Sequence, residues 1–215
     1  MAFDPASAGR LVIYGGTFDP PHRAHVELPR AAAAAIDADG VLYVPAGRPP
    51  HKLAHQQTDA RHRLAMLERA LAGLDNVAIS TFEIDQPGPS YTVATLEHLR
   101  KSLGDRVEFR LLIGVDMALV FAKWHQPDRI EQLAQPLVMA RPPHDRQRFV
   151  DALPADQRDR WRGRIVDLPL LAISSTELRR AIADHGVEAP LAREALAPAV
   201  RRYIAEHGLY TGAIE

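Results

Sequence analysis

One stretch of sequence decides the fold, Arg10-Leu-Val-Ile-Tyr-Gly-Gly-Thr-Phe-Asp-Pro-Pro-His-Arg-Ala-His25, in which an apolar run leads into two glycines. Leu11 to Tyr14 is the short apolar segment that is typical of a central parallel strand. Gly15 and Gly16 let the backbone approach a ligand closely, because they carry no Cβ. A strand that ends in glycines before a helix start predicts a loop that binds phosphate.

Two histidines follow these glycines at a spacing of three residues. If a helix begins near Pro21, after the turn signal at Asp19, then His22 and His25 share one face of its first turn. The positive end of the helix dipole favours an anion there. Imidazoles at this place can donate hydrogen bonds to phosphoryl oxygens and stabilise charge that develops during transfer. We interpret both as candidate catalytic residues; the alternative is a strand, a turn and two surface histidines.

Composition limits the class of protein. The 215 residues suffice for one well-buried α/β core. Lys and Arg number 26 against 27 Asp and Glu, so we expect no nucleic-acid partner. Without cysteine there is neither a disulfide framework nor a cysteine nucleophile. We find no basic and apolar leader and no apolar run long enough to span a membrane, so we expect no membrane partner and a cytoplasmic location. A homo-oligomer is possible, and the oligomeric state stays open.

Short apolar runs alternate with helical patterns, which predicts βαβ units and a central parallel sheet flanked by helices. We expect one domain over residues 1–215, with the core sheet and its helices in 10–170 and a small C-terminal helical part in 171–215, where one face carries Val200, Tyr203 and Ile204. The expected strands are Leu11–Tyr14, Val41–Val44, Val77–Ile79, Phe109–Ile113, Leu137–Ala140 and, as a later candidate, Ile165–Leu168.

Leucines and valines at helical spacing predict buried helix faces. The residues concerned are Leu64, Leu67, Leu71 and Leu74 in one segment and Val93, Leu96 and Leu99 in another. Pro29 lies inside a helical pattern from Pro21 to Ile36, so we expect a kink or a break there. Residues 141–164, rich in proline and charge, are interpreted as a mobile or peripheral insertion.

Residues 15–25 resemble the nucleotidyltransferase signature GGTFDPxHxGH, which ends in the (H/T)xGH motif. The variant with two leading glycines and a first histidine is similar to that of the nicotinate mononucleotide adenylyltransferases. One departure is Ala24, which stands where the family has glycine and suits a helix better. The resemblance implies a Rossmann-like nucleotidyltransferase fold. It also assigns Gly15, Gly16, Thr17 and Phe18 to ATP binding.

Two further motifs resemble the nucleotide-binding parts of this family. Ser174 to Glu177 reads as a capping box, in which Ser174 accepts a hydrogen bond from the backbone of Glu177. A helix start of this kind, with Arg179 one turn in, can also hold phosphate. The resemblance assigns the β and γ phosphates of ATP to Ile173, Ser174, Ser175, Thr176 and Arg179. It places Gly114 and Asp116 near the ribose and phosphates, although Gly-x-Asp alone reads as a turn; whether Arg180 replaces a further basic residue of the motif stays open.

Three other segments resemble the acceptor-binding loops of the family. In those loops a tryptophan stacks on the pyridine ring and backbone amides receive its carboxylate. The residues concerned are Pro50, His51 and Lys52, then Ser90, Tyr91 and Thr92, and finally Trp124 and His125. Taken alone, the segment with Pro50, His51 and Lys52 is as typical of a solvated basic loop as of a ligand-binding loop. Trp124 is likewise as typical of a core or interface packing residue as of a stacking residue.

The resemblance implies adenylyl transfer from ATP to nicotinate mononucleotide, which gives deamido-NAD and pyrophosphate in NAD biosynthesis. Mg²⁺ would offset the polyphosphate charge through waters and substrate oxygens, so we name no protein ligand for it. Two alternatives remain. One is a related enzyme with another acceptor, such as phosphopantetheine or nicotinamide mononucleotide. The other is a non-catalytic nucleotide sensor on the same fold.

Overall fold

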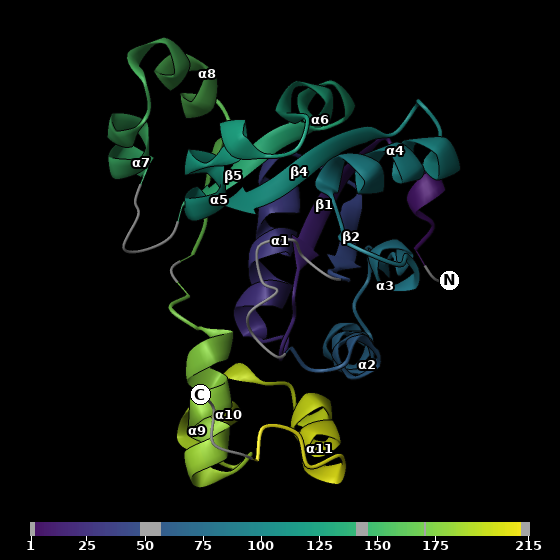
Figure 1. The fold of residues 1–215 in the computed structure, drawn as a ribbon, viewed down its shortest axis with the longest axis vertical. Helices are drawn as coiled ribbons and strands as arrows, with labels where there is room; N and C mark the ends of the chain where they lie inside the picture. Colours follow the sequence, from purple (N-terminus) through teal and green to yellow (C-terminus); the bar gives the residue numbers. More distant parts are fainter. Residues whose placement is uncertain (1–2, 48–56, 141–145, 170, 212–215) are drawn as a thin grey trace.

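The structure is a computed structural model that describes residues 3–47, 57–140, 146–169 and 171–211. Within these residues, six strands form one parallel sheet in the order β3-β2-β1-β4-β5-β6 (Figure 1). The strands are β1 Arg10–Gly16, β2 Gly40–Pro45, β3 Val77–Ile79, β4 Glu108–Gly114, β5 Gln135–Ala140 and β6 Ile165–Asp167. The direction of strand order reverses between β1 and β4, as in doubly wound sheets, which confirms the predicted Rossmann-like α/β fold.

Helices cover both faces of the sheet (Figure 1). On one face, α4 contributes the predicted stripe of Val93, Leu96 and Leu99 to a cluster with side chains of β1 and β4. On the other face, α1 and α2 pack against the alternate residues of the same strands. The helices before the C-terminal part are α1 Arg23–Ala35, α2 Ala60–Leu71, α3 Phe82–Asp85, α4 Thr92–Leu103, α5 Val115–Leu119, α6 Pro127–Leu133, α7 Arg146–Ala152 and α8 Arg158–Arg162, with 3₁₀ turns η1 Pro5–Ser7, η2 Phe121–Lys123 and η3 Ala155–Gln157.

Two expectations about the first helices are corrected. Helix α1 is not broken at Pro29, which lies inside one continuous helix and is buried against the sheet. In α2, Leu67 and Leu71 are core residues as predicted, but Leu64 and Leu74 are only partly buried. The face of α2 that is buried carries Arg63 and Met66 in addition. The four-residue spacing of positions 63, 67 and 71 sets this face, and Leu74 lies beyond the end of the helix.

Where the structure describes it, the segment interpreted as a mobile or peripheral insertion forms helices that pack against the core cluster. Helices α7 and α8 carry Phe149 and Trp161, whose rings meet edge to face at 5.9 Å. Trp161 also contacts Phe121, and all three residues belong to the core cluster on that face of the sheet. Aromatic burial therefore holds this segment in place, although its sequence is rich in charge.

The C-terminal helices form a group of their own at one end of the molecule (Figure 1). They are α9 Ser175–His185, α10 Pro190–Ala195 and α11 Pro198–Glu206. Val200, Tyr203 and Ile204 are buried in one cluster, as the spacing predicts. Met66 of α2 joins that cluster, so α2 connects the sheet to the C-terminal helices.

Candidate functional site

The loop after β1 lies at the point where the strand order reverses, which is where open α/β sheets bind ligands. Gly16 is required there, because a Cβ at this position would lie 2.8 Å from the ring of Phe18. Phe18 adopts a left-handed backbone conformation with φ 52° and is almost fully buried. Its ring packs on Tyr14 and edge to face on His25. The side chain of Phe18 therefore supports His25 from the interior.

The two histidines of the signature lie against each other. Helix α1 begins at Arg23 and not near Pro21, so His22 is the N-cap residue and His25 is in the first turn. Their rings are stacked with centroids 3.7 Å apart and 21° between the planes. The backbone N–H of His22 donates to Nδ1 of His25 at 3.3 Å. A neutral imidazole that accepts at Nδ1 carries its proton at Nε2, so the ring of His25 is fixed in this tautomer by the contact.

The alanine that replaces a family glycine causes no obstruction. Ala24 is 1% exposed and belongs to the hydrophobic cluster under α1. Its methyl group packs into the core, so the substitution adds helix propensity and buried area.

The start of α9 docks on the same loop. Ser175 Oγ donates to the carbonyl of Pro20 at 3.0 Å, and Arg179 Nη1 donates to the carbonyl of Asp19 at 2.7 Å. Ser174 is the N-cap residue, but the expected capping box is wrong because its side chain makes no cap hydrogen bond. The hydroxyl that makes the structural contact is that of Ser175, one residue later. The side chain of Ser174 therefore does not bond to the backbone N–H groups in the first turn of α9. Ile173 precedes this helix start, and Thr176 lies in its first turn.

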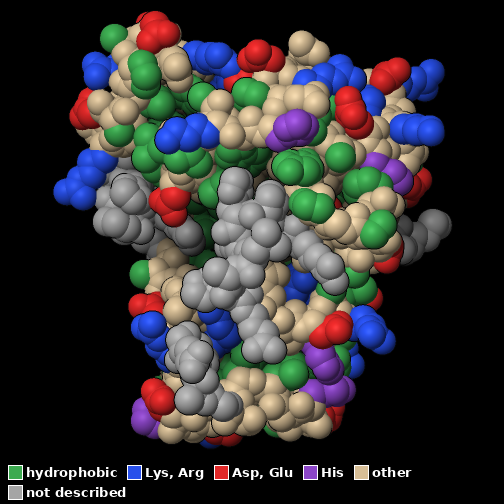
Figure 2. Space-filling view, viewed as in Figure 1, with side chains coloured by type: hydrophobic (Ala, Val, Ile, Leu, Met, Phe, Trp, Pro, Cys, Tyr) green, Lys and Arg blue, Asp and Glu red, His purple; other side chains and the backbone are tan. Residues whose placement is uncertain are grey.

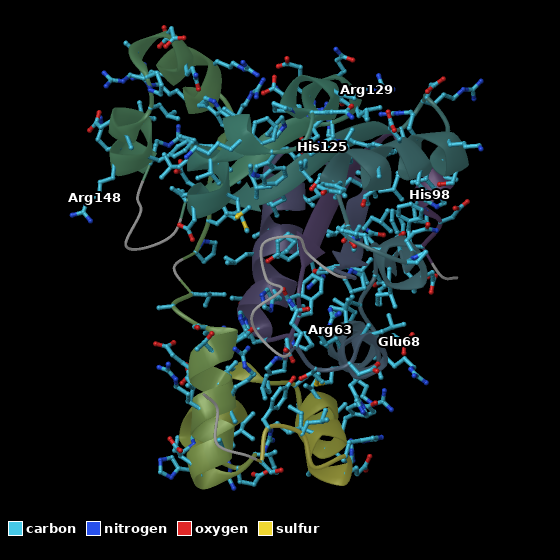
Figure 3. The ribbon with its side chains drawn as sticks, viewed as in Figure 1. Arg63, Glu68, His98, His125, Arg129 and Arg148 are labelled. Atoms are coloured by element: carbon cyan, nitrogen blue, oxygen red, sulfur yellow. The ribbon has the colours of Figure 1, made fainter. Side chains whose placement is uncertain are left out.

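Arg63 of α2 is a buried residue that contacts this loop and that sequence reasoning did not identify. Figure 3 shows it between the sheet and the C-terminal helices. Its Nη1 donates to the carbonyl of Thr17 at 2.8 Å and its Nε to that of Thr58 at 2.9 Å. Burial lowers the pKa of Arg63, and the neighbouring carboxylate of Asp19 acts in the opposite direction. A charged residue on an apolar helix stripe was the available signal, since buried arginines are rare unless they are paired.

The end of β4 lies beside β1 at the same end of the sheet and carries the next two expected site residues. Gly114 is the N-cap residue of α5, and Asp116 lies exposed in its first turn. A Cβ built on Gly114 meets no described atom within 4 Å. Among the described residues, none would therefore obstruct a group that approaches this backbone.

The segments expected to bind the acceptor come together beside β2 and α4. Tyr91 precedes Thr92 at the start of α4, and its ring lies 4.8 Å from that of His125. Trp124 is partly buried against Phe121, at a centroid distance of 5.2 Å. Figure 2 shows hydrophobic side chains at the surface of this half of the molecule. Tyr91 and His125 thus form an exposed ring pair, and the half-buried Trp124 directly precedes His125, which Figure 3 labels; we refer to these three residues as the aromatic surface.

Ser90 lies at the inner edge of this surface. A Cβ on Gly47, which follows β2, would come 2.8 Å from Ser90 Oγ and 1.9 Å from the carbonyl oxygen of Glu83. Only glycine fits this crossing of the two segments. The expected residues Pro50, His51 and Lys52 lie outside the described residues, a few positions after Gly47.

Glu83 is a second residue that sequence reasoning missed. Its carboxylate accepts a hydrogen bond from Thr95 Oγ1 at 2.7 Å. Burial raises the pKa of Glu83, against the opposing effect of hydrogen bonds from Thr95 and the backbone of Gly47. Hydrogen bonds to this buried carboxylate connect α3 to α4, to Gly47 after β2 and to Ser90.

The described residues contain no group of three or more His, Cys, Asp or Glu that could hold a metal ion. In the part of the chain that the structure describes, we find no helix long and apolar enough to cross a membrane.

Comparisons with known proteins agree with this geometry. The model of the cytidylyltransferase-like family matches residues 13–181. Curated relatives named probable nicotinate-nucleotide adenylyltransferase include those of Thermomicrobium roseum, 40% identical over 94% of this chain and 91% of the relative, and Albidiferax ferrireducens, 37% identical over 95% and 99%. A solved structure of Plasmodium falciparum nicotinic acid mononucleotide adenylyltransferase complexed with NaAD has the same fold, with a TM-score of 0.70, 18% identity and coverage of 96% and 99%.

Proposed function

Since the chain belongs to the cytidylyltransferase-like family and to the nicotinate-nucleotide adenylyltransferases, we propose that it transfers the adenylyl group of ATP to nicotinate mononucleotide. The products are deamido-NAD and pyrophosphate, as a step of NAD biosynthesis. The observation that carries the proposal is the docking of Arg179 and Ser175 on the loop that presents His22 and His25. This contact brings two phosphate-binding motifs, far apart in the sequence, to one place.

The reaction is a single displacement at phosphorus. An oxygen of the mononucleotide 5′-phosphate forms a bond to the α-phosphorus, and the bond from that phosphorus to the oxygen of the leaving pyrophosphate breaks. No covalent intermediate with the protein is needed, so catalysis consists of positioning and charge stabilisation. His25, with its Nε2 proton, and His22 donate to the transferring and bridging phosphate oxygens. The backbone of Gly15, Gly16 and Thr17 lies beside them.

The leaving pyrophosphate is assigned to the start of α9. Arg179 is partly exposed and donates through Nη1 to Asp19, while its Nη2 lies 3.4 Å from Thr176 Oγ1. The guanidinium therefore keeps donors for the β and γ phosphates. Mg²⁺ enters with ATP as part of the substrate and offsets the charge of the phosphates. Phosphate oxygens and water are proposed to hold this ion.

Acceptor binding is assigned to the aromatic surface beside α4. The ring of Trp124 is proposed as the stacking face for the pyridine ring, and Ser90, Tyr91, Thr92 and His125 are proposed to bind the rest of the acceptor, with Tyr91 and His125 in ring contact. Pro50, His51 and Lys52 are also proposed to bind the acceptor. A small-molecule enzyme of this kind needs no nucleic-acid or membrane partner, and its location in the cytoplasm and its single-domain organisation stay predictions.

Product identification tests the function. The purified chain is incubated with ATP, Mg²⁺ and nicotinate mononucleotide, and the products are identified by mass spectrometry. We expect deamido-NAD and pyrophosphate in equal amounts. Binding of ATP with no dinucleotide formed from any mononucleotide would favour the non-catalytic sensor instead.

A further inference from the structure

Asp19 is a buried carboxylate at the centre of the signature loop, and it is held from several elements. It is 6% exposed. Tyr210, near the C-terminus, donates to Oδ1 at 2.6 Å, and the backbone N–H of Thr58 donates to Oδ2 at 3.2 Å. Arg179 donates to the backbone carbonyl of the same residue. The loop between β1 and α1 is therefore fixed through the side chain and the backbone of one residue.

The contact between Tyr210 and Asp19 joins positions 191 residues apart. Burial, and next the charge of Asp19, raise the pKa of the Tyr210 hydroxyl, so it stays protonated and donates. Tyr210 has a left-handed backbone conformation with φ 63°, which is uncommon for a bulky residue. Such a conformation persists where surrounding contacts demand it, and it often marks a functional place.

Arg63 supports the same loop from below. It donates to the carbonyls of Thr17 and Thr58, which flank Asp19 in space. The charge of the Asp19 carboxylate raises the pKa of Arg63, against the larger lowering effect of burial. The buried carboxylate of Asp19 thus has a hydrogen-bond donor in Tyr210 and a cation nearby in Arg63.

We propose that Tyr210 is a positioning residue for adenylyl transfer, acting through Asp19 on His22 and Arg179. The proposal rests on the proposed function. The hydrogen bond from Tyr210 fixes the position of Asp19. Asp19 lies three residues before His22, and its carbonyl accepts the hydrogen bond from Arg179, so the same contact positions both residues. Removal of the Tyr210 hydroxyl leaves a buried carboxylate oxygen without its donor, and the loop relaxes.

The expected effect is on turnover more than on substrate affinity. A small displacement of groups that act on the transition state can cost as much as ~100-fold in rate. For Tyr210→Phe we expect kcat to fall by ~10-fold or more. The KM values for ATP and for the mononucleotide should change by no more than about twofold, because the residues that contact the substrates remain.

Tyr203→Phe is the matched control. Tyr203 belongs to the same helical group, and its hydroxyl lies 2.9 Å from Nδ1 of His62 on α2, away from the loop. Both variants lose one buried tyrosine hydroxyl, so both should lose a similar amount of thermal stability. Only Tyr210→Phe should lose turnover. If its kcat matches that of Tyr203→Phe, the contact is structural and the proposal is overturned.

Asp19→Asn covers the case in which Tyr210→Phe does not fold. The amide keeps the size of the side chain but removes the charge that Arg63 and Tyr210 balance. We expect a reduced kcat with nearly unchanged KM values, and a kcat equal to that of the unmodified enzyme would overturn the proposal. Unmodified enzyme is measured alongside. If it forms no dinucleotide, the proposed function fails and the positioning role falls with it; if it turns over while the variants do so equally well, only the positioning role fails.

Discussion

His22 and His25 lie ring on ring, with centroids 3.7 Å apart, at the amino end of α1. Phe18 packs edge to face against His25 from the interior. The backbone N–H of His22 donates to Nδ1 of His25, which places the proton of a neutral His25 ring on Nε2. The pair is therefore held in place before a nucleotide binds, which is what charge stabilisation in phosphoryl transfer requires.

Replacement of His25 by alanine should reduce kcat by roughly 100-fold or more, the range found when one preorganised donor to a transition-state charge is removed. ATP affinity should fall much less, because other groups hold the nucleotide. Steady-state kinetics and ATP titration measure the two effects. His185→Ala, an exposed histidine at the end of α9, is the control and should leave both unchanged. Near-normal turnover in a folded His25→Ala protein would remove this residue from the mechanism.

Arg179→Ala should raise the KM for ATP by ~10-fold, as expected for loss of a charge-assisted hydrogen bond. Inhibition by pyrophosphate should weaken as well, while the KM for the mononucleotide changes little. Arg180→Ala, exposed on the next position of α9, is the matched control. A rise in the acceptor KM instead would show that the phosphates bind elsewhere, and an equal effect of Arg180→Ala would show that the charge is not specific to Arg179.

Gly114→Ala separates nucleotide binding from folding. The backbone at Gly114 has φ −73°, which alanine accepts, and a Cβ there meets no described atom of the protein within 4 Å. The melting temperature should therefore stay the same or rise slightly, because alanine reduces the entropy of the unfolded chain. If ATP passes close to this backbone, its KM should rise, by roughly 10-fold for a clash of about 1.4 kcal/mol. An unchanged KM for ATP would contradict the assignment of Gly114 to ATP binding.

The buried carboxylate of Glu83 should make stability depend on pH. Burial raises its pKa in the folded protein above the unfolded value of about 4.3. Its contribution to stability is then fully present below about pH 4 and is lost as the pH rises through the folded pKa. Melting temperatures of the unmodified protein and of Glu83→Gln are compared between pH 4 and pH 8.

The advantage of the unmodified protein over Glu83→Gln should be largest at pH 4 and should shrink toward neutral pH. Glu68→Gln, an exposed carboxylate on α2, is the control and should give a difference that does not vary with pH. A difference for Glu83→Gln that grows as the pH rises would contradict the assigned direction.

Much of the fold could be predicted because local patterns report it. The strands were short apolar runs bounded by glycine, proline or charge, and each of the six expected runs is a strand. Leu64 was misplaced because a stripe of leucines was taken as the buried face, whereas Arg63 occupies that face and satisfies its donors on backbone carbonyls. Hydrophobic spacing cannot show such a pairing.

The same contrast holds for the site, where residues in sequence motifs could be predicted and residues joined by tertiary contacts could not. The histidines, Gly114 and Arg179 stood in recognisable motifs, but the contact of Tyr210 with Asp19 joins opposite ends of the chain and leaves no local pattern. Ser174 was expected to cap α9 because the motif reads as a capping box; in the structure Ser175 bonds to Pro20 instead. Both the Tyr210 contact and the Ser175 contact depend on tertiary structure, which a local sequence motif does not report.

Acceptor choice follows from the polarity of the proposed pyridine site. A carboxylate is an anion that loop N–H groups can receive, whereas a carboxamide presents its own N–H donors to them. A site with polar groups arranged for a missing partner rejects the analogue strongly, because those groups stay unpaired. Nicotinamide mononucleotide should therefore be a poor substrate, and phosphopantetheine should not react.

The most direct test is the rate of pyrophosphate release from ATP and Mg²⁺ by the pure protein with each of these three acceptors in turn. We predict release that depends on nicotinate mononucleotide, with a kcat/KM at least ~100-fold above that for nicotinamide mononucleotide, or roughly 2.7 kcal/mol. Equal rates with both mononucleotides would contradict the acceptor assignment alone. No acceptor-dependent pyrophosphate with any of the three would contradict adenylyl transfer itself.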